Sequence, residues 1–172
     1  MMASFVELAR ALIDLRVCYL LIGVSGANLH AHHAGVVFTT QDRDVFLPPD
    51  ARNLWRAWQA CESCSLELSS AGRPLDQPRD LALAERVVQR LASTSATDRR
   101  GLQVDLTLLM AGFTFDEVWR ERVAFRLEGV EVPVARLKHI VASKAAVGRD
   151  KDRLFLATHA AALRELLDSD ER

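Results

Sequence analysis

The stretch FTTQDRDVFL, residues 38–47, places two aspartates at the start of an apolar run. The run, followed by prolines, predicts a strand, and side chains alternate across a strand. We therefore expect Asp42 and Asp44 to share one face, with Arg43 on the other. Two neighbouring carboxylates disfavour joint ionisation unless a cation lies between them, and oxygen ligands suit Mg²⁺ or Mn²⁺. The pattern thus suggests a metal site.

Two other segments bear on this interpretation, because an isolated pair of aspartates is also typical of a solvated strand start. The run CYLLIG predicts a buried strand that ends at Gly23 and turns directly into a helix, with Ser25 as the expected N-cap. Such a turn favours a phosphate, because its amide groups and the helix dipole attract an anion. Asp105 lies within LQVDLTLLM, where an uncompensated buried acid would cost several kcal/mol. It is either a ligand or faces water at a strand end.

Periodicity and turn signals predict the other elements. A capping box at Ser4 and Glu7 begins a helix over 4–16, Asp50 caps another, and Thr114 with Glu117 forms a second capping box. Further expectations are helices over 51–61, 81–92 and 115–122, a short strand at 65–69, loops over 69–80 and 93–101, a hairpin over 123–134, and two tail helices broken near 147–152. These elements predict one α/β (α+β) domain over 1–172, with a mixed central sheet flanked by helices and C-terminal helices.

Composition excludes some classes of protein. The 172 residues carry a formal net charge of −1 and are 49% hydrophobic, as in an ordinary globular domain. No apolar run approaches the roughly 20 residues of a membrane span, and no secretory signal is evident, so we expect a cytoplasmic protein without a membrane partner. The three cysteines are too few for a disulfide framework and are expected to be reduced.

The order of these segments resembles the nucleotidyltransferase superfamily, which has the DNA polymerase beta-like fold. The closer likeness is to small bacterial nucleotidyltransferase toxins of the abortive-infection type. The segments that carry it are GVSGANLHA at 23–31, TQDRDV at 40–45, Asp105, Lys144 and GRDKD at 148–152. The resemblance runs from about residue 17 to 160, and the order of the segments is more specific than any one of them.

The resemblance implies an activity and a site. The chain would transfer a nucleoside monophosphate from a nucleoside triphosphate (NTP) to a hydroxyl group on RNA, protein or a small molecule, with Mg²⁺ or Mn²⁺ as cofactor. Asp42, Asp44 and Asp105 would be catalytic and bind the metal. The nucleotide would be bound by Gly23, Ser25, Thr40, Lys144, Arg149 and Lys151. A toxin of this kind implies an antitoxin, or a second copy of the chain, as partner.

The chain departs from the family pattern at two positions on the expected triphosphate side. Val24 replaces a small residue, and Phe38 stands where many relatives have an arginine. These departures support an alternative, a catalytically degenerate binding or regulatory module with the same fold. The basic residues near the tail also allow a plain interpretation, that of a solvated helix junction. A third interpretation is an unrelated α/β protein in which the aspartate pair is accidental.

Overall fold

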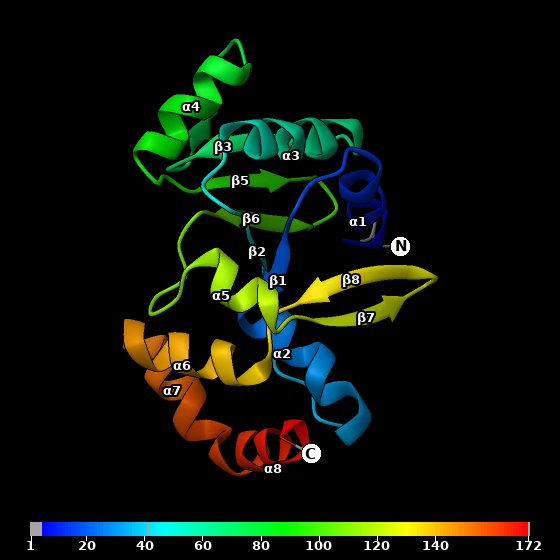
Figure 1. Cartoon of the computed structure of the whole chain (residues 1–172), viewed down its shortest axis with the longest axis vertical. Helices are drawn as coiled ribbons and strands as arrows, with labels where there is room; N and C mark the ends of the chain where they lie inside the picture. The colour runs from blue at the N-terminus through cyan, green and yellow to red at the C-terminus, as the bar shows by residue number, and fades with distance from the viewer. Residues whose placement is uncertain (1–4, 41, 172) are drawn as a thin grey trace.

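The computed structural model describes residues 5–40 and 42–171, and it is built around one sheet (Figure 1). In those residues the sheet has eight strands in the order β4-β3-β5-β6-β2-β1-β8-β7. The strands are β1 (Leu20–Ile22), β2 (Asp42–Phe46), β3 (Glu67–Ser70), β4 (Arg73–Pro74), β5 (Thr94–Thr97), β6 (Gln103–Thr107), β7 (Val123–Leu127) and β8 (Val130–Val134). The helices are α1 (Phe5–Asp14), α2 (Gly23–Ala31), the 3-10 turn η1 (His32–Ala34), α3 (Ala51–Ser63), α4 (Leu81–Gln89), α5 (Phe115–Arg120), α6 (Leu137–Val147), α7 (Asp150–Thr158) and α8 (Ala160–Asp170).

The sheet is mixed, as the sequence predicts. Strand β2 runs parallel to β6 and β1 runs parallel to β8, whereas the other neighbouring pairs are antiparallel. The parallel pair β2 and β6 needs a crossover, which α3, β3, α4 and β5 supply. This crossover places two strands that are far apart in sequence next to each other at the centre of the sheet.

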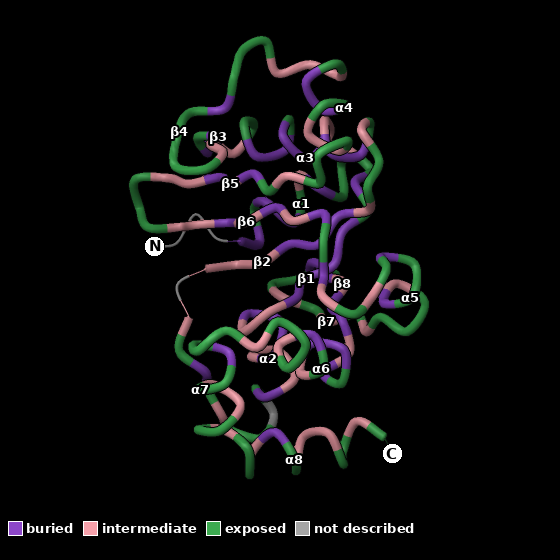
Figure 2. Tube along the Cα trace, turned by 90° about the vertical axis from the view of Figure 1, so that its left-hand side faces the viewer, coloured by how far each residue is buried: buried purple, intermediate pink, exposed green. Residues whose placement is uncertain are grey.

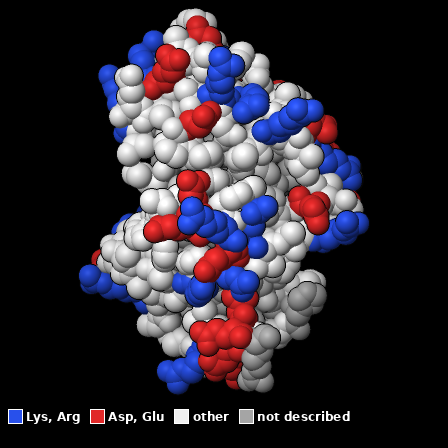
Figure 3. Space-filling model, in the orientation of Figure 1, with Lys and Arg blue, Asp and Glu red and all other residues white. Residues whose placement is uncertain are grey.

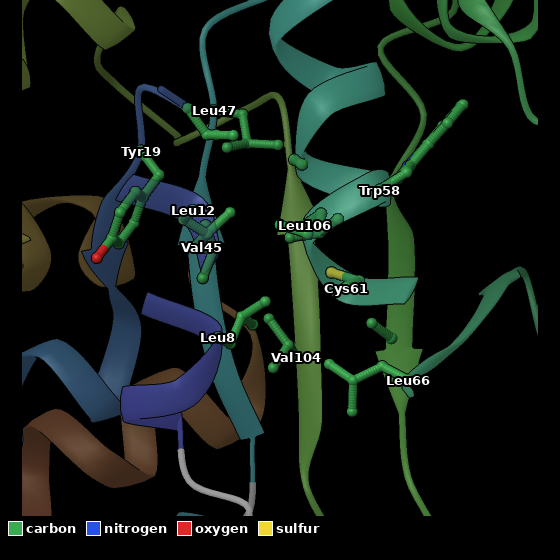
Figure 4. Packing of buried hydrophobic residues seen from close by; sticks show 14 of the residues in the cluster. Leu8, Leu12, Tyr19, Val45, Leu47, Trp58, Cys61, Leu66, Val104 and Leu106 are labelled. Atoms are coloured by element: carbon green, nitrogen blue, oxygen red, sulfur yellow. The ribbon is translucent and has the colours of Figure 1, made fainter. Parts of the chain in front are cut away.

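One face of the sheet is fully covered. Val45 on β2 pairs with Leu106 on β6, and Ala96 on β5 pairs with Val104 on β6 and with Leu68 on β3. All five are buried in the core that also contains residues of α1 and α3. Figure 4 shows this packing, in which Trp58 from α3 lies over the strands. The indole of Trp58 also donates a hydrogen bond to a buried hydroxyl on β5 at 3.1 Å, which satisfies its one polar atom.

The opposite face is covered over only part of its width. Leu20 and Phe46 pack there in a second core against α2, α5 and α6, with Ile140 at its centre. Farther out, on β6, β5 and β3, the residues whose side chains leave the sheet on this face are polar, and all of them except the exposed Glu67 are half-buried. Figure 2 shows how burial changes along these strands. We call this surface the open sheet face; it comprises Gln103, Asp105, Ser95, Thr97, Glu67 and Ser69.

Several local predictions are confirmed. Helix α1 lies within the predicted 4–16, although the expected cap Ser4 lies outside the described residues. The Asp50 side chain accepts from the amide of Asn53 at 2.8 Å, and Thr114 with Glu117 forms the capping box. Strands β7 and β8 form the expected hairpin.

Other predictions are wrong. Residues 93–101, predicted as a loop, contain β5, because pairing with β3 and β6 overrides the weak strand propensity of a Ser- and Thr-rich stretch. Ser25 is not an N-cap, since α2 begins at Gly23 and makes no side-chain cap bond. The tail forms three helices, because the chain breaks again at His159. None of the helices in the described part of the chain is long and apolar enough to cross a membrane.

Candidate active site

The structure places two of the three predicted acids side by side. Asp44 on β2 and Asp105 on β6 are partners in the parallel register, so their side chains leave the sheet on the same face. Asp42 pairs with Gln103 one step earlier and therefore also shares this face, as the strand alternation predicts. All three acids lie where the cover of the second core ends and the open sheet face begins.

The environment of Asp44 disfavours its charged form. Burial, and after it the neighbouring Asp105 carboxylate, raise the pKa of Asp44 to about 6. The positive charge of Lys144 acts in the opposite direction and stabilises the carboxylate. A buried acid with a like charge beside it is the arrangement that a bound cation would relieve.

The turn between β1 and α2 is built around Gly23. Its φ of +66° is a conformation that side chains rarely adopt, and a Cβ atom there would occupy the space of the Asp44 carboxylate oxygen Oδ2. Glycine therefore allows the carboxylate to lie against the first turn of α2. The first amides of α2 have no acceptor within the helix and no side-chain cap, so the predicted phosphate site at this turn stays a prediction.

Ser25 joins the turn to β2 instead of capping the helix. Its hydroxyl donates to the carbonyl of Ile22 at 3.0 Å and accepts from the amide of Asp44 at 3.4 Å. Ser25 is buried, so this hydroxyl fixes the position of the Asp44 backbone relative to α2. Thr40 lies at the entry to β2, where its hydroxyl donates to the Asp42 carbonyl at 3.2 Å and accepts from the Asp42 amide at 3.3 Å.

Asp105 has two hydrogen-bond donors on the open sheet face. Ser95 Oγ donates to Asp105 Oδ1 at 2.8 Å, and Gln103 Nε2 donates to the same oxygen at 3.4 Å. Both bonds go to Oδ1, and Oδ2 accepts no hydrogen bond from the described part of the chain. Sequence reasoning missed Ser95, because its segment was interpreted as a loop. The available signal was the alternation of Thr94 and Ala96 with the more polar Ser95 and Thr97.

The basic residues of the tail come together at the junction of α6 and α7. Lys144 Nζ lies 3.3 Å from Asp152 Oδ1, and Arg149 Nε donates to Asp152 Oδ2 at 2.8 Å. The Asp152 side chain is only 1% exposed. Its burial would raise its pKa, but the hydrogen bond from Arg149 and the charge of Lys144 outweigh that effect and lower it. Lys151 is exposed, and its charge also favours the ionised form of Asp44.

These groups line a cleft of about 390 Å³. Its polar wall contains Gly23, Asp44, Asp105, Lys144 and Arg149, and its apolar residues include Leu109 and Ile140. The other predicted residues, Ser25, Thr40, Asp42 and Lys151, are not among its lining residues. A larger hollow of about 670 Å³ lies elsewhere and contains none of the predicted residues.

The donor atoms suit a divalent cation, because they are carboxylate oxygens in a partly buried site with an excess of negative charge. Asp44 and Asp105 are the pair that would hold it, with Asp42 two residues away on the same strand face. Within residues 5–40 and 42–171, no group of three or more His, Cys, Asp or Glu side chains that could hold a metal ion is found. The three-aspartate metal site therefore stays a prediction.

The mixed sheet flanked by helices defines the class: the chain has a nucleotidyltransferase-like fold. A solved structure with this arrangement is TM1012 from Thermotoga maritima, which is provisionally named a nucleotidyltransferase. The two chains are 14% identical and superpose with a TM-score of 0.53 over 98% of this chain and 96% of that one. This likeness shows the fold. No protein-family model and no curated protein matches the sequence.

Proposed function

We propose that the protein is a metal-dependent nucleotidyltransferase that moves a nucleoside monophosphate from an NTP to a hydroxyl group of an acceptor. The observation that carries the proposal is the register pair Asp44 and Asp105, which lies beside the Gly23 turn in a cleft with Lys144 and Arg149. The fold by itself does not determine which side chains line the cleft, so the presence of these five residues in it is a separate observation. The acceptor would be RNA, a protein or a small molecule.

The residues of the cleft would have three roles: to hold the metal, to bind the phosphates and to accept a proton. Asp42, Asp44 and Asp105 would hold Mg²⁺ or Mn²⁺, which when bound supplies positive charge to the triphosphate and the reacting oxygens. Lys144 and Arg149 would bind the β- and γ-phosphates, assisted by the first amides of α2. Asp105 would accept the proton of the acceptor hydroxyl through Oδ2, since Ser95 and Gln103 occupy Oδ1.

The reaction needs no reactant other than the NTP and the acceptor hydroxyl. The acceptor oxygen forms a bond to the α-phosphorus, the bond from that phosphorus to the oxygen bridging to the β-phosphorus breaks, and pyrophosphate leaves. The hydroxyl proton passes to Asp105. The positive charges of Lys144 and Arg149 stabilise the negative charge that develops on the pyrophosphate.

The proposal includes the finer assignments that the resemblance implies. The protein would act like a small nucleotidyltransferase toxin, with an antitoxin or a second copy of the chain as partner. Because its substrate is an NTP, the proposed location is the cytoplasm. The one-domain organisation over 1–172 is also part of the proposal.

Transfer of label from α-phosphate-labelled NTPs tests the activity. The protein would be incubated with each NTP, Mg²⁺ or Mn²⁺, and cellular RNA or protein. We expect Asp44→Asn and Asp105→Asn to lower transfer at least about 100-fold. Asp116→Asn, a change of the same charge at an exposed position on α5, should leave transfer unchanged. Label transfer that survives both active-site substitutions would contradict the proposal.

A second candidate is a binding module without turnover. The Asp152 carboxylate already neutralises part of the charge of Lys144 and Arg149, and Phe38 replaces the family arginine. Titration calorimetry separates the two candidates. Binding of a metal–NTP complex without label transfer would favour the module, whereas transfer to any acceptor would exclude it.

A further inference from the structure

A groove of about 390 Å³ lies between β4 and α4. Ser70 and Arg73 are register partners that both line it, whereas the adjacent Ser69 belongs to the open sheet face. Side chains alternate along a strand, so Ser70 and Arg73 leave the sheet on the face opposite to the active-site acids. Leu83, which also lines the groove, belongs to the core that contains residues of α1 and α3. The groove is therefore separate from the candidate active-site cleft.

The charged side chains of this groove are mostly basic. Arg73 on β4, Arg86 on α4 and Arg90 at the C-cap of α4 line it together with one acid, Asp76. Arg86 and Arg90 are four residues apart, so they lie on the same side of the helix. Three positive charges and one negative charge leave a net charge of +2. We call this site the basic groove; its charge is opposite to that of a phosphate monoester, which carries about −1.5 to −2 at pH 7.

The guanidinium groups of these three arginines are available to a ligand. All three side chains are exposed, and none has a salt-bridge or hydrogen-bond partner within residues 5–40 and 42–171. The neighbouring Arg79 differs, because it donates to two backbone carbonyls and forms a salt bridge with Glu62. Arg79 thus holds the structure together at this edge of the sheet, whereas the arginines of the basic groove do not.

Positive charge does not extend beyond the basic groove as a continuous band. Glu85 precedes Arg86 on α4 and is exposed, and the exposed Glu67 lies on the open sheet face. Figure 3 shows acidic side chains between the basic ones at this end of the molecule, around α4. A nucleic-acid strand longer than the groove would pass these acids, so the charges favour a compact anion. The volume of the groove also lies within the range of small-ligand pockets.

We propose that the basic groove binds a nucleoside monophosphate, at a site separate from the candidate active site. Guanidinium groups donate paired hydrogen bonds to phosphate oxygens, so two of the arginines can hold the phosphate. The guanidinium plane of the third can stack on the base. Pro74, which is exposed, and Val87, which is half-buried, provide apolar surface for the same ring. Inorganic phosphate would leave this surface unused, and adenosine would leave the arginines without an anion.

Titration calorimetry with AMP, in a buffer that contains EDTA, tests the site without metal or turnover. AMP has no pyrophosphate to release, so it is not a donor in the proposed reaction. We expect AMP to bind at least about tenfold more tightly than adenosine or inorganic phosphate, because only AMP contacts both the arginines and the apolar surface. Binding of adenosine or inorganic phosphate as tight as that of AMP would contradict the proposal.

Two triple variants locate the binding site. The groove variant carries Arg73→Ala, Arg86→Ala and Arg90→Ala. Its matched control removes the same charge from exposed positions outside the groove, through Arg99→Ala, Arg100→Ala and Arg126→Ala. All six side chains are exposed, so both variants are expected to fold, and thermal unfolding checks this. AMP affinity should fall at least about tenfold in the groove variant and at least about threefold in Arg86→Ala alone, while the control stays within about twofold of the unmodified protein.

Lys144→Ala shows whether AMP binds in the candidate active-site cleft instead. We expect this variant to bind AMP as tightly as the unmodified protein, because Lys144 lines the cleft and not the groove. A loss of AMP binding in Lys144→Ala, equal losses in the groove variant and its control, or no AMP binding by the unmodified protein would overturn the inference. Groove-dependent binding of a single-stranded RNA without a terminal phosphate, tighter than that of AMP, would also overturn it. The proposed function depends on label transfer and fails separately.

Discussion

Asp44 lies in an environment that favours its neutral form, so its ionisation lowers the stability of the folded protein. Its pKa is raised from 3.8 to about 6 by burial and by Asp105. Above pH 6 the side chain is ionised in both the folded and the unfolded chain, and the folded state bears the penalty, about 3 kcal/mol for a shift of this size. As the pH falls from 6 to below 3.8, the side chain becomes neutral in both states and the penalty disappears.

We therefore predict that Asp44→Asn stabilises the protein at pH 8 by up to about 3 kcal/mol, because a neutral amide does not bear the penalty. The gain should shrink as the pH falls from 6 to 4. Urea unfolding at pH 8 and at pH 4.5 measures it. A stability difference that is the same at both pH values would show that burial of the charge is not its cause.

Gly23 and Gly35 form a natural comparison, since both have a φ close to +67° but only Gly23 contacts the site. Gly35→Ala should cost about 1–2 kcal/mol for the left-handed backbone alone, because no atom of the described residues lies within 4 Å of a Cβ at that position. Gly23→Ala should cost more and should also weaken Mg²⁺ binding, because its methyl group displaces the Asp44 carboxylate. Chemical unfolding and metal titration compare the two variants. Equal effects would contradict the close packing of Gly23 and Asp44.

At the scale of elements, Phe38 connects α2 to α7. The Asn28 side chain accepts from the Phe38 amide at 2.7 Å and donates to its carbonyl at 2.8 Å. The Phe38 ring, 1% exposed, packs edge-on against Phe155 and His159 with centroid distances of 5.1 and 4.8 Å. The residue that departs from the family pattern is therefore part of the second core, where an arginine would bury a charge.

Phe38→Ala should destabilise the protein by about 3–5 kcal/mol, because it leaves a cavity between α2 and α7. The adjacent Val37 is 82% exposed, so Val37→Ala should change stability by less than about 0.5 kcal/mol. Guanidinium unfolding of the two variants provides the comparison. A loss below 1 kcal/mol for Phe38→Ala would mean that α7 is not held through this ring.

The junction of α6 and α7 depends on Asp152, which holds a lysine from one helix and an arginine from the turn before the other. Asp152→Asn should cost about 3 kcal/mol, because it leaves the half-buried Lys144 without its buried carboxylate partner. It should also increase the reactivity of Lys144 toward an amine-modifying reagent, measured by peptide mass spectrometry, because the amine no longer has a carboxylate as its ion-pair partner.

Asp150→Asn is the matched control for that substitution. Asp150 lies in the first turn of the same helix but is exposed, so its loss should cost less than about 1 kcal/mol and leave Lys144 reactivity unchanged. If the two variants behave alike, the effect would come from the charge at the start of α7 and not from the buried ion pair.

At the scale of the whole molecule, the two hydrophobic cores lie on opposite faces of one sheet. Leu21 and Val45 belong to one core, whereas their chain neighbours Leu20 and Phe46 belong to the other. Strands β1 and β2 thus contribute to both. Loss of either core would leave these two strands uncovered on one face, so the cores should not unfold separately.

We predict one cooperative thermal transition for the chain. The calorimetric enthalpy should match the van't Hoff enthalpy within error, as for a small two-state domain. Two resolved transitions in differential scanning calorimetry would contradict the shared role of β1 and β2, and with it the one-domain proposal.

The elements that the sequence predicts well are those whose signal is local. The cap at Asp50, the capping box at Thr114 and the hairpin of β7 and β8 each depend on residues close together in the chain. The elements it misses depend on distant partners. Strand β5 forms because β3 and β6 are on either side of it, and its own residues carry little apolar periodicity.

The same division applies to the site. Alternation along a strand was enough to place Asp42 and Asp44 on one face, and the order of segments was enough to suggest the nucleotidyltransferase-like fold. Only the fold could bring Asp105 into register with Asp44 and place Ser95 beside it, because the β2–β6 pairing joins residues about 60 positions apart. It also made Asp152 the buried partner of Lys144 and Arg149. The sequence by itself determined which acids could act and which strand face they share, since those are properties of local geometry. The tertiary structure alone decided which groups surround them, since burial, charge pairing and pKa depend on contacts that the chain order does not encode locally.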